Sequence, residues 1–433
     1  MAIELNWKHA GVSREEVEVV AQRAMRRVAE LRSVAREKNY SDPAYAVALP
    51  FEKKFLVQST ALAKEYRDAE LLIVVGIGGS NLGTMAVEEA MRGKNSSGPK
   101  ILYADTVDAG QIAGIKREIK ATAKRGGKVL LNAISKSGST TETIANFAAL
   151  YAELKNNYPT PEKRVVVTAD PTSKLAAVAK QNKFTLLPIP GEIGGRYSVF
   201  SNVSLFPLAV AGVDCKELIR GASEMQTRCF ASNWSKNPAS INAALMYKQR
   251  KHGRRVHNTF YFSNDLESCG KWYAQLLAES IGKKTNTSGR VVREGILPLV
   301  SLAGDLHRIG QLFYAGPNNT FHRLIRLRGT EKVEIPANAI KGINNLVPHI
   351  QGKQMAAVMN AIINGVEISM AQQGIPFFEI SLNDKKEHGI GELLQLQMNE
   401  TMLLGWLLHV NPFDQPDVEL YKEETKKMLM KGH

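Results

Sequence analysis

Two loops of glycine and hydroxyl-bearing residues each follow an apolar run and precede a helical pattern. The first loop is Gly76–Gly83 (Gly-Ile-Gly-Gly-Ser-Asn-Leu-Gly), after the apolar run 71–75. The second is 135–143 (Ser-Lys-Ser-Gly-Ser-Thr-Thr-Glu-Thr), after the apolar run 128–134. A loop of this kind between a strand and a helix directs backbone N–H groups, hydroxyls and the positive end of a helix dipole at one point. Because such a point binds phosphate, the loops predict a phosphorylated small molecule held between them.

The second loop is the more specific of the two. Lys136 adds a positive charge to it, and six of its nine residues carry hydroxyls: Ser135, Ser137, Ser139, Thr140, Thr141 and Thr143. Capping a helix needs one hydroxyl. The six hydroxyls therefore favour a phosphate cradle over an ordinary helix cap.

The first loop resembles the dinucleotide fingerprint Gly-x-Gly-x-x-Gly, with Asp105 at about the distance where that motif has an acidic residue. However, Asn81 stands where the third glycine belongs, and the next glycine is Gly83. No Gly-Lys-Ser/Thr sequence closes the loop as in a P-loop. An NAD-binding oxidoreductase and a simple tight turn remain alternatives, but Ser80 at the helix start favours contact with a ligand.

The composition is that of an ordinary globular protein, with 433 residues, 44% hydrophobic and 23% charged. This length predicts two domains plus terminal elements. The three cysteines form no Cys-x-x-Cys pair, which favours a reducing compartment without disulfides or zinc. The first residues lack a signal-peptide pattern, and no apolar run approaches the roughly 20 residues that span a bilayer. We expect a cytoplasmic protein without a membrane partner.

The formal net charge of +14 raises the question of a nucleic-acid partner. The densest basic cluster, 248–255, lacks the interleaved aromatic residues of a single-strand binding platform. A solvated basic face is therefore favoured, and no nucleic-acid partner is expected. The histidines show no metal-binding spacing, so no metal site is predicted.

Apolar strand patterns alternate with helical patterns from residue 71 onward, which predicts an α/β fold with parallel sheets covered on both faces. Strands are expected at 71–75, 101–104, 128–134, 164–168, 184–189, 258–262, 295–300, 320–327 and 377–382. Residues 190–204 look irregular, and helical patterns resume at 216–228. We divide the chain into an N-terminal helical segment 1–69, a first domain 70–215, a second domain 216–410 and a tail 411–433.

Two further motifs complete a recognisable set: Gly194-Gly-Arg-Tyr-Ser198, and Asn411-Pro-Phe-Asp-Gln415 followed by Glu419 and Lys422. With the two loops, they make the chain resemble the glucose-6-phosphate isomerase family from about residue 70 to 422. The resemblance implies two sugar-isomerase (SIS-type) domains, each a parallel sheet flanked by helices. It also implies interconversion of glucose 6-phosphate and fructose 6-phosphate without a metal or organic cofactor.

The resemblance assigns roles to individual residues. Glu279 corresponds to the catalytic base, Arg196 to an arginine beside the reacting carbons, and His307 and Lys422 to the ring-opening residues. The residues implied to bind substrate or its phosphate are Gly79, Ser80, Ser135, Lys136, Ser137, Thr140, Thr143 and Gln415. In the family the histidine comes from the partner subunit, which implies a homodimer with a shared site. Two departures are Asp417, where the family usually has Gly, and Ile281, where many relatives have a polar residue.

These residue types suit aldose–ketose isomerisation. One carboxylate can move a proton between C1 and C2 on one face of a cis-enediol, so Glu279 suffices as the base. Arg196 is always protonated and would stabilise the enediolate oxygen. Histidine is the side-chain type most suited to proton exchange near neutral pH, so His307 fits ring opening, with Lys422 assisting.

Besides the NAD-binding oxidoreductase, two other functions remain open. A non-catalytic sugar-phosphate-binding protein would keep the hydroxyl loop but could dispense with Glu279, His307 and Lys422. All three are present, which favours the enzyme. An isomerase that also accepts mannose 6-phosphate would depend on a small residue near the base, which the sequence does not identify.

Overall fold

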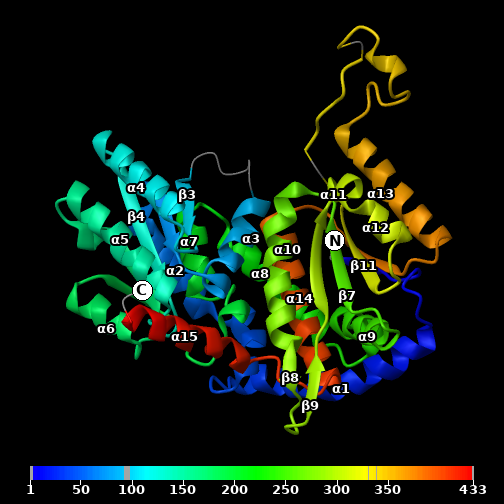
Figure 1. Ribbon diagram of the computed structural model, residues 1–433, viewed down its shortest axis with the longest axis horizontal. Coiled ribbons are helices and arrows are strands. Elements are labelled where there is room, and N and C mark those ends of the chain that lie inside the picture. The colour runs from blue at the N-terminus through cyan, green and yellow to red at the C-terminus, as the bar shows by residue number, and fades with distance from the viewer. Residues whose placement is uncertain (1–2, 92–97, 330, 338, 432–433) are drawn as a thin grey trace.

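Figure 1 shows the computed structural model of the chain, which describes residues 3–91, 98–329, 331–337 and 339–431. Within these residues the strands form two five-stranded sheets and one two-stranded hairpin. The first sheet and its helices lie on the left of Figure 1, and the second sheet lies on the right. This arrangement confirms the α/β class with two parallel sheets flanked by helices. No helix among the described residues is long and apolar enough to cross a bilayer.

The first sheet is entirely parallel, in the order β3-β2-β4-β5-β6. Its strands are β2 (Ala69–Val75), β3 (Lys100–Ala104), β4 (Lys128–Ile134), β5 (Val165–Ala169) and β6 (Thr185–Pro188). Helices α4 (Ala109–Lys124), α5 (Thr141–Asn157) and α6 (Lys174–Gln181) pack on one face, and α2 (Lys53–Ala63) and α7 (Asn202–Val210) on the other. Because both faces are covered, the central strands are apolar along their length rather than alternating.

The second sheet has the order β1-β12-β11-β7-β10, parallel except for β1. Its strands are β1 (Glu4–Asn6), β7 (Val256–Tyr261), β10 (Leu297–Leu302), β11 (Thr320–Leu327) and β12 (Phe377–Leu382). Helices α12 (Gly310–Ala315) and α13 (Met355–Gln372) cover one face, and α9 (Pro238–Lys251), α10 (Glu267–Ile281) and α14 (Glu387–Leu407) the other. The short helix α11 (Asp305–Arg308) follows β10.

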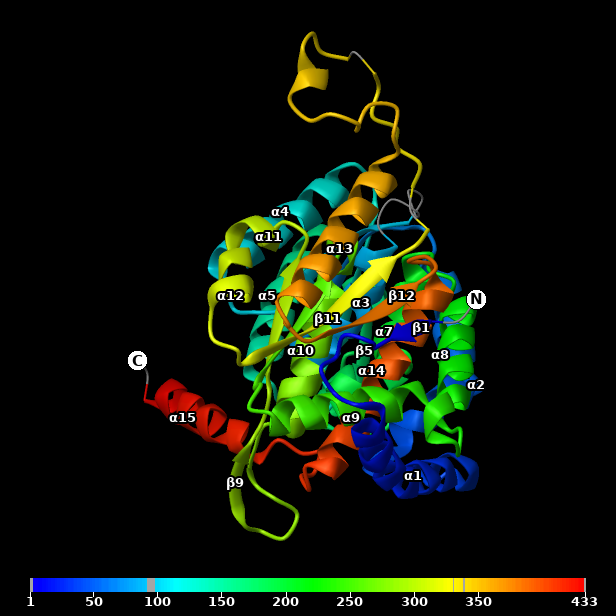
Figure 2. The same ribbon diagram turned by 90° about the vertical axis from the view of Figure 1, so that its right-hand side faces the viewer.

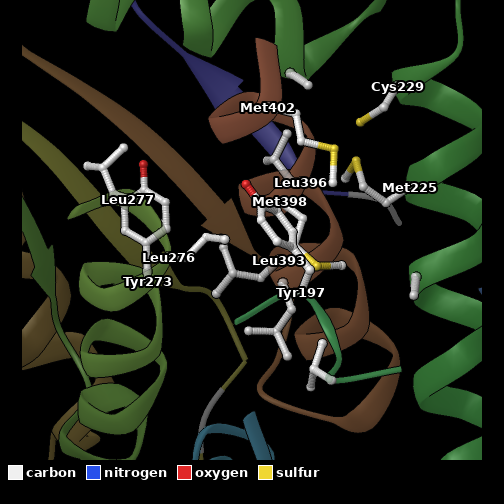
Figure 3. Close-up of a cluster of buried hydrophobic side chains, with 14 of the residues drawn as sticks. Tyr197, Met225, Cys229, Tyr273, Leu276, Leu277, Leu393, Leu396, Met398 and Met402 are labelled. Atoms are coloured by element: carbon white, nitrogen blue, oxygen red, sulfur yellow. The ribbon is translucent and has the colours of Figure 1, made fainter. Parts of the chain in front are cut away.

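The space between the sheets is filled by a continuous apolar core. Figure 3 shows part of it, with side chains converging from α8 (Cys215–Cys229), α10 and α14. Helices α1 (Arg14–Glu37) and α3 (Leu82–Ala90) contribute to the same core. Buried aromatic and aliphatic side chains dominate it, which makes it the main apolar contribution to the stability of the fold. The core therefore fixes α10 relative to the first sheet.

The structure confirms all nine predicted strands within two residues and adds elements that the sequence did not predict. Helix α7 begins at Asn202, inside the stretch 190–204 that the sequence predicts to be irregular, and runs beyond it to Val210. It is buried on nearly all sides and includes Pro207, so it shows no amphipathic period. Residues 4–6 form β1 and pair with β12, so the segment 1–69 is not purely helical. A hairpin of β8 (Lys283–Thr285) and β9 (Val291–Glu294) follows α10. The domain boundaries themselves stay a proposal.

A group of two carboxylates and one guanidinium links α13 to the second sheet. Arg326 Nη2 lies 2.9 Å from Glu367 Oε2, and Arg326 Nε lies 2.7 Å from Glu379 Oε2. Burial, followed by a hydrogen bond with Glu379, raises the pKa of Glu367 to about 7. Burial acts in the same direction on Glu379, but hydrogen bonds from Glu367, Ser381 and Arg326 outweigh it, so the pKa of Glu379 is lowered. The pair therefore shares one proton at mildly acidic pH.

We expect Glu367→Gln to stabilise the protein above pH 7. Between the ordinary pKa of 4.5 and about 7, folded Glu367 keeps a proton that the unfolded chain has lost, so the free energy of unfolding falls as pH rises. Glutamine stays neutral, which removes this loss and raises the free energy of unfolding by about 1–2 kcal/mol at pH 8. Urea unfolding of the wild type and of Glu367→Gln, at about pH 5 and at pH 8, measures this difference in the free energy of unfolding. If Glu367→Gln lost more stability than the wild type between pH 5 and pH 8, the proton assigned to Glu367 would be wrong.

Candidate active site

The glycine loop 76–83 and the hydroxyl loop 135–143 lie side by side at the carboxyl edge of the first sheet. The glycine loop follows β2 and the hydroxyl loop follows β4, and these strands are hydrogen-bonded neighbours, with Val75 opposite Ala133. The chain passes from β2 to β3 on one side and then crosses to β4 on the other. In open parallel sheets this reversal of strand order is where ligands bind. The fold therefore places both loops at the expected position of a ligand site.

The hydroxyl loop is organised by its own side chains. Ser135 Oγ accepts a hydrogen bond from Gly138 N at 3.1 Å and lies 3.3 Å from Thr140 Oγ1. Ser139 N and Oγ donate to Ser137 Oγ at 3.4 and 3.3 Å. Gly138 has φ +66°, a conformation that glycine adopts without strain. The result is a compact turn directly before α5.

Two residues of this loop have distinct environments. Thr143 is buried in the first turn of α5, and its hydroxyl has no hydrogen-bond partner among the described residues. Lys136 is partly buried, and burial lowers the pKa of its ammonium while the carboxylates of Glu192 and Asp170 oppose the shift. A cation at the start of a helix adds to the positive end of the helix dipole. The loop therefore offers hydroxyls, N–H groups and one cation to an anion.

The glycine loop is pressed against the turn that carries Arg196. A Cβ on Gly79 would lie 2.2 Å from the carbonyl carbon of Gly195, so any side chain there would clash with backbone. Gly78 has φ +57°, and a Cβ there would lie 2.7 Å from Gln275 Nε2. Only glycine fits at both positions. The close approach brings the first loop, the Arg196 turn and α10 into contact.

Arg196 is the centre of the hydrogen-bonded network at this contact. Its side chain is 2% exposed. Nε donates to Ser280 Oγ at 2.9 Å, and Nη1 donates to Gln415 Oε1 at 2.7 Å and to Glu279 Oε2 at 3.3 Å. Nη2 donates to the carbonyl oxygens of Pro412 at 2.8 Å and Asp414 at 3.2 Å. These contacts hold the guanidinium in one orientation beside the carboxylate.

Glu279 stands in the last turn of α10 with its side chain 34% exposed. Its Oε1 accepts a hydrogen bond from Gln275 Nε2 at 3.0 Å, one turn earlier on the helix. The carboxylate is thus oriented from two sides, by Gln275 and Arg196, and remains accessible. Gln275 was missed by the sequence interpretation, although its spacing of four residues from Glu279 on one helix could have revealed it.

A model of the phosphoglucose isomerase family matches residues 56–318, more than half of the chain. The chain belongs to the phosphoglucose isomerase family. Among curated relatives, a probable glucose-6-phosphate isomerase of Methanococcus maripaludis is 32% identical over 370 residues, which cover 84% of this chain and 79% of that protein. A glucose-6-phosphate isomerase of Thermus thermophilus is 34% identical over 373 residues, covering 84% of this chain and 86% of that protein.

Two solved structures have the same fold as this chain. A hypothetical protein of Thermus thermophilus matches with a TM-score of 0.89 and 30% identity over 99% of both chains. A glucose-6-phosphate isomerase of Chlamydia trachomatis matches with a TM-score of 0.85 and 18% identity, over 99% of this chain and 88% of that chain. The latter match shows a common fold. The family model and the curated relatives confirm the resemblance seen in the sequence motifs at the level of the family.

Not all residues implied by the phosphoglucose isomerase resemblance come together in one chain. Gly79, Arg196, Glu279 and Gln415 are in direct or near contact, as described above. His307 is exposed on α11, which follows the carboxyl end of β10. Helix α10 starts at that same edge of the second sheet and runs away from it, so Glu279, 12 residues along the helix, lies about 18 Å from its start.

Lys422 is also separate from Glu279. It lies on α15 (Glu419–Met430), where its ammonium bonds to Glu419 Oε1 at 2.6 Å. None of the described residues of α15 is buried, and in Figure 2 the helix projects from the rest of the molecule. Asp417, the departure from the family motif, is exposed just before this helix. Ile281, the other departure, is fully buried in the main core, which accounts for an apolar residue there.

No group of three or more His, Cys, Asp or Glu side chains in the described part of the chain is arranged to hold a metal ion. The cysteines Cys215, Cys229 and Cys269 are free and buried. Burial raises the pKa of each of these thiols to about 12, so they remain protonated. Their packing is that of small apolar residues in the core.

Proposed function

We infer that this chain catalyses the reversible interconversion of glucose 6-phosphate and fructose 6-phosphate, a step of glycolysis and gluconeogenesis. The activity is the one for which its curated relatives are named. The observation that carries it to this chain is the accessible Glu279 carboxylate, held 3.3 Å from Arg196 Nη1 beside the two loops. A base and a fixed cation next to loops suited to bind phosphate fit the isomerisation of a sugar phosphate.

We propose that the hydroxyl loop binds the phosphate and that the glycine loop contacts the sugar. Ser135, Lys136, Ser137, Thr140 and Thr143 supply the phosphate contacts in this proposal, with Gly79 and Ser80 nearer the sugar. Support comes from the position of both loops at the reversal of strand order and from the start of α5 behind the hydroxyls. Binding energy from the remote phosphate then holds the reacting carbons against the base.

In the proposed chemical step, the Glu279 carboxylate removes the proton from C2 of the open-chain aldose. The electron pair of the C2–H bond forms the C1–C2 double bond, and the carbonyl pair moves to O1, giving a cis-enediolate. Arg196 stabilises the negative oxygen. A proton then passes from the O2 hydroxyl to O1. Glu279 returns its proton to C1, and the product is the ketose. Proton transfer and a fixed cation complete this cycle, so we propose that no metal or organic cofactor takes part.

We propose that the enzyme is a homodimer in which His307 reaches the site of the partner. Within one chain His307 and Glu279 stand at opposite edges of the second sheet. The segment between β11 and α13 extends away from the body of the molecule (Figures 1 and 2) and exposes Ile340, Leu346 and Val347 by 64%, 74% and 53%. Exposed apolar side chains on a projecting segment suit contact with a second copy.

We propose that α15 also becomes ordered against the rest of the assembly, which would bring Lys422 toward the ring oxygen of the substrate. The helix exposes large apolar side chains in one chain: Leu420, Tyr421, Met428, Leu429 and Met430. An amphipathic helix without a packing partner is marginal in water. Lys422 would then assist His307 in ring opening.

A cytoplasmic location is also proposed. Three free, buried cysteines are typical of proteins from reducing compartments. A role in glycolysis has the same implication. The basic composition is assigned to a solvated surface, with neither a nucleic acid nor a membrane as partner.

The purified protein is expected to convert fructose 6-phosphate to glucose 6-phosphate in chelator-treated buffer without nucleotide. Direct observation of the sugars by 13C NMR avoids any coupling enzyme. Unphosphorylated fructose should react at least 100-fold more slowly, because it lacks the group that the loops hold. Mannose 6-phosphate in parallel measures the breadth of the activity. Binding without turnover would favour a sugar-phosphate sensor, and turnover only with NAD would favour an oxidoreductase.

A further inference from the structure

Lys283 lies next to the base but has no role in the reaction described so far. It is the first residue of β8, two positions after the end of α10, and its side chain is 5% exposed. Its ammonium donates to the carbonyl oxygen of Glu279 at 2.8 Å and to the carbonyl oxygen of Asp414. It also lies 3.1 Å from Asp414 Oδ1. One cation therefore joins the residue that carries the base to the C-terminal tail.

The position of this cation follows from the end of α10. The carbonyl of Glu279 is among the last four of the helix, which have no partner inside the helix. A cation at this end also interacts favourably with the helix dipole. Burial lowers the pKa of Lys283, and the hydrogen bond and charge of Asp414 oppose the shift. Three oxygen acceptors thus compensate for the removal of the ammonium from water.

The tail is held by two cations that share an acceptor. The carbonyl oxygen of Asp414 receives hydrogen bonds from both Lys283 Nζ and Arg196 Nη2. Asp414 Oδ2 in turn accepts from Asn411 Nδ2 at 2.8 Å, which fixes the turn of the tail. Gln415, the next residue, accepts from the same Arg196 nitrogen that contacts Glu279. Movement of Asp414 would therefore change the position of Arg196 relative to the carboxylate.

We propose that Lys283 is a positioning residue for the isomerisation: by joining Asp414 to the end of α10, it sets the distance between the Arg196–Gln415 pair and the Glu279 carboxylate. The proposal rests on the proposed function, because it concerns the rate of that reaction. Lys283 acts through its neighbours and does not itself transfer a proton. Misplacement of reacting groups by about 1 Å can lower a rate by roughly 10²-fold. The phosphate site lies on other elements, after β4 and at the start of α5, and would be unaffected.

The test compares Lys283→Met with Lys284→Met. Lys284 is the exposed neighbour on the same strand and provides a matched control. We expect Lys283→Met to lower kcat by roughly 10- to 100-fold with less than about a threefold change in KM, while Lys284→Met retains the wild-type values. Thermal unfolding and the dimer content of both variants measure any loss of fold. If the wild type itself is inactive, the proposed function fails and this inference fails with it.

A conservative variant separates positioning from general stability. Lys283→Arg keeps a cation that can bond to two carbonyls, so we expect it to recover most of kcat. Because arginine does not deprotonate below about pH 12, its activity should also extend to higher pH than that of the wild type. Folded Lys283→Met with a wild-type kcat would overturn the proposal. So would a decrease in kcat that only follows the fraction of unfolded protein.

Discussion

Glu279→Gln will lower the kcat of isomerisation by roughly 10²- to 10⁴-fold and leave sugar-phosphate binding nearly unchanged. The amide has the shape of the carboxylate, and its oxygen can still accept a hydrogen bond from Arg196. Its NH2 group can donate to Gln275 Oε1, which has no partner among the described residues, once the Gln275 amide turns over, so the network around it persists. It cannot accept the proton from C2, because an amide is not a base at neutral pH. The loss therefore falls on kcat, with little effect on binding.

The measurement is exchange of the C2 proton of glucose 6-phosphate with D2O, followed by 1H NMR. Sorbitol 6-phosphate has no carbonyl and cannot react, so its binding by calorimetry reports sugar-phosphate binding without turnover. Glu267→Gln is the matched control, since Glu267 lies in the first turn of the same helix and pairs with Lys271 at 2.9 Å on the surface. If Glu279→Gln exchanged the proton at the wild-type rate, another residue would be the base.

The part of the site that the sequence predicted consists of local motifs. Both loops follow strands that are apolar along their length, because the sheet is buried on two faces, and such strands are easily seen in a sequence. Their convergence follows from the order of parallel strands. The hydroxyl loop therefore needed no tertiary information to be found.

The network around the base was not predictable in the same way. Arg196 and Gln415 are separated by 219 positions, and Lys283 and Asp414 by 131. Several of the acceptors are backbone carbonyls, whose positions depend on the path of the tail and not on residue type. Sequence motifs identified Arg196 and Gln415 through the family resemblance, but they gave no indication that Lys283 joins the same group.

The separation of His307 from Glu279 has a consequence that two inactive variants can test. His307 stands at the carboxyl edge of the second sheet, and Glu279 lies about 18 Å along the helix that starts there. Two identical chains related by a two-fold axis can bring the histidine of each to the base of the other. A chain lacking only its base and a chain lacking only its histidine would then complement each other.

Glu279→Gln and His307→Asn chains, each nearly inactive alone, will regain activity when co-expressed with different affinity tags. In a mixed dimer one site lacks both groups, and the other site combines the intact Glu279 of one chain with the intact His307 of its partner. With equal amounts, half of the dimers are mixed and each has one intact site, so about one quarter of the wild-type activity is expected.

Purification through both tags isolates the mixed dimer, whose activity should be about half that of the wild type per dimer. A dimer of Glu279→Gln with the double variant is the control, because it contains no intact base and must stay inactive. If base and histidine belonged to the same chain, each site of the mixed dimer would lack one group. The isolated mixed dimer would then be as inactive as its parents, and the shared site would be wrong, while turnover by the wild type would still support the proposed reaction.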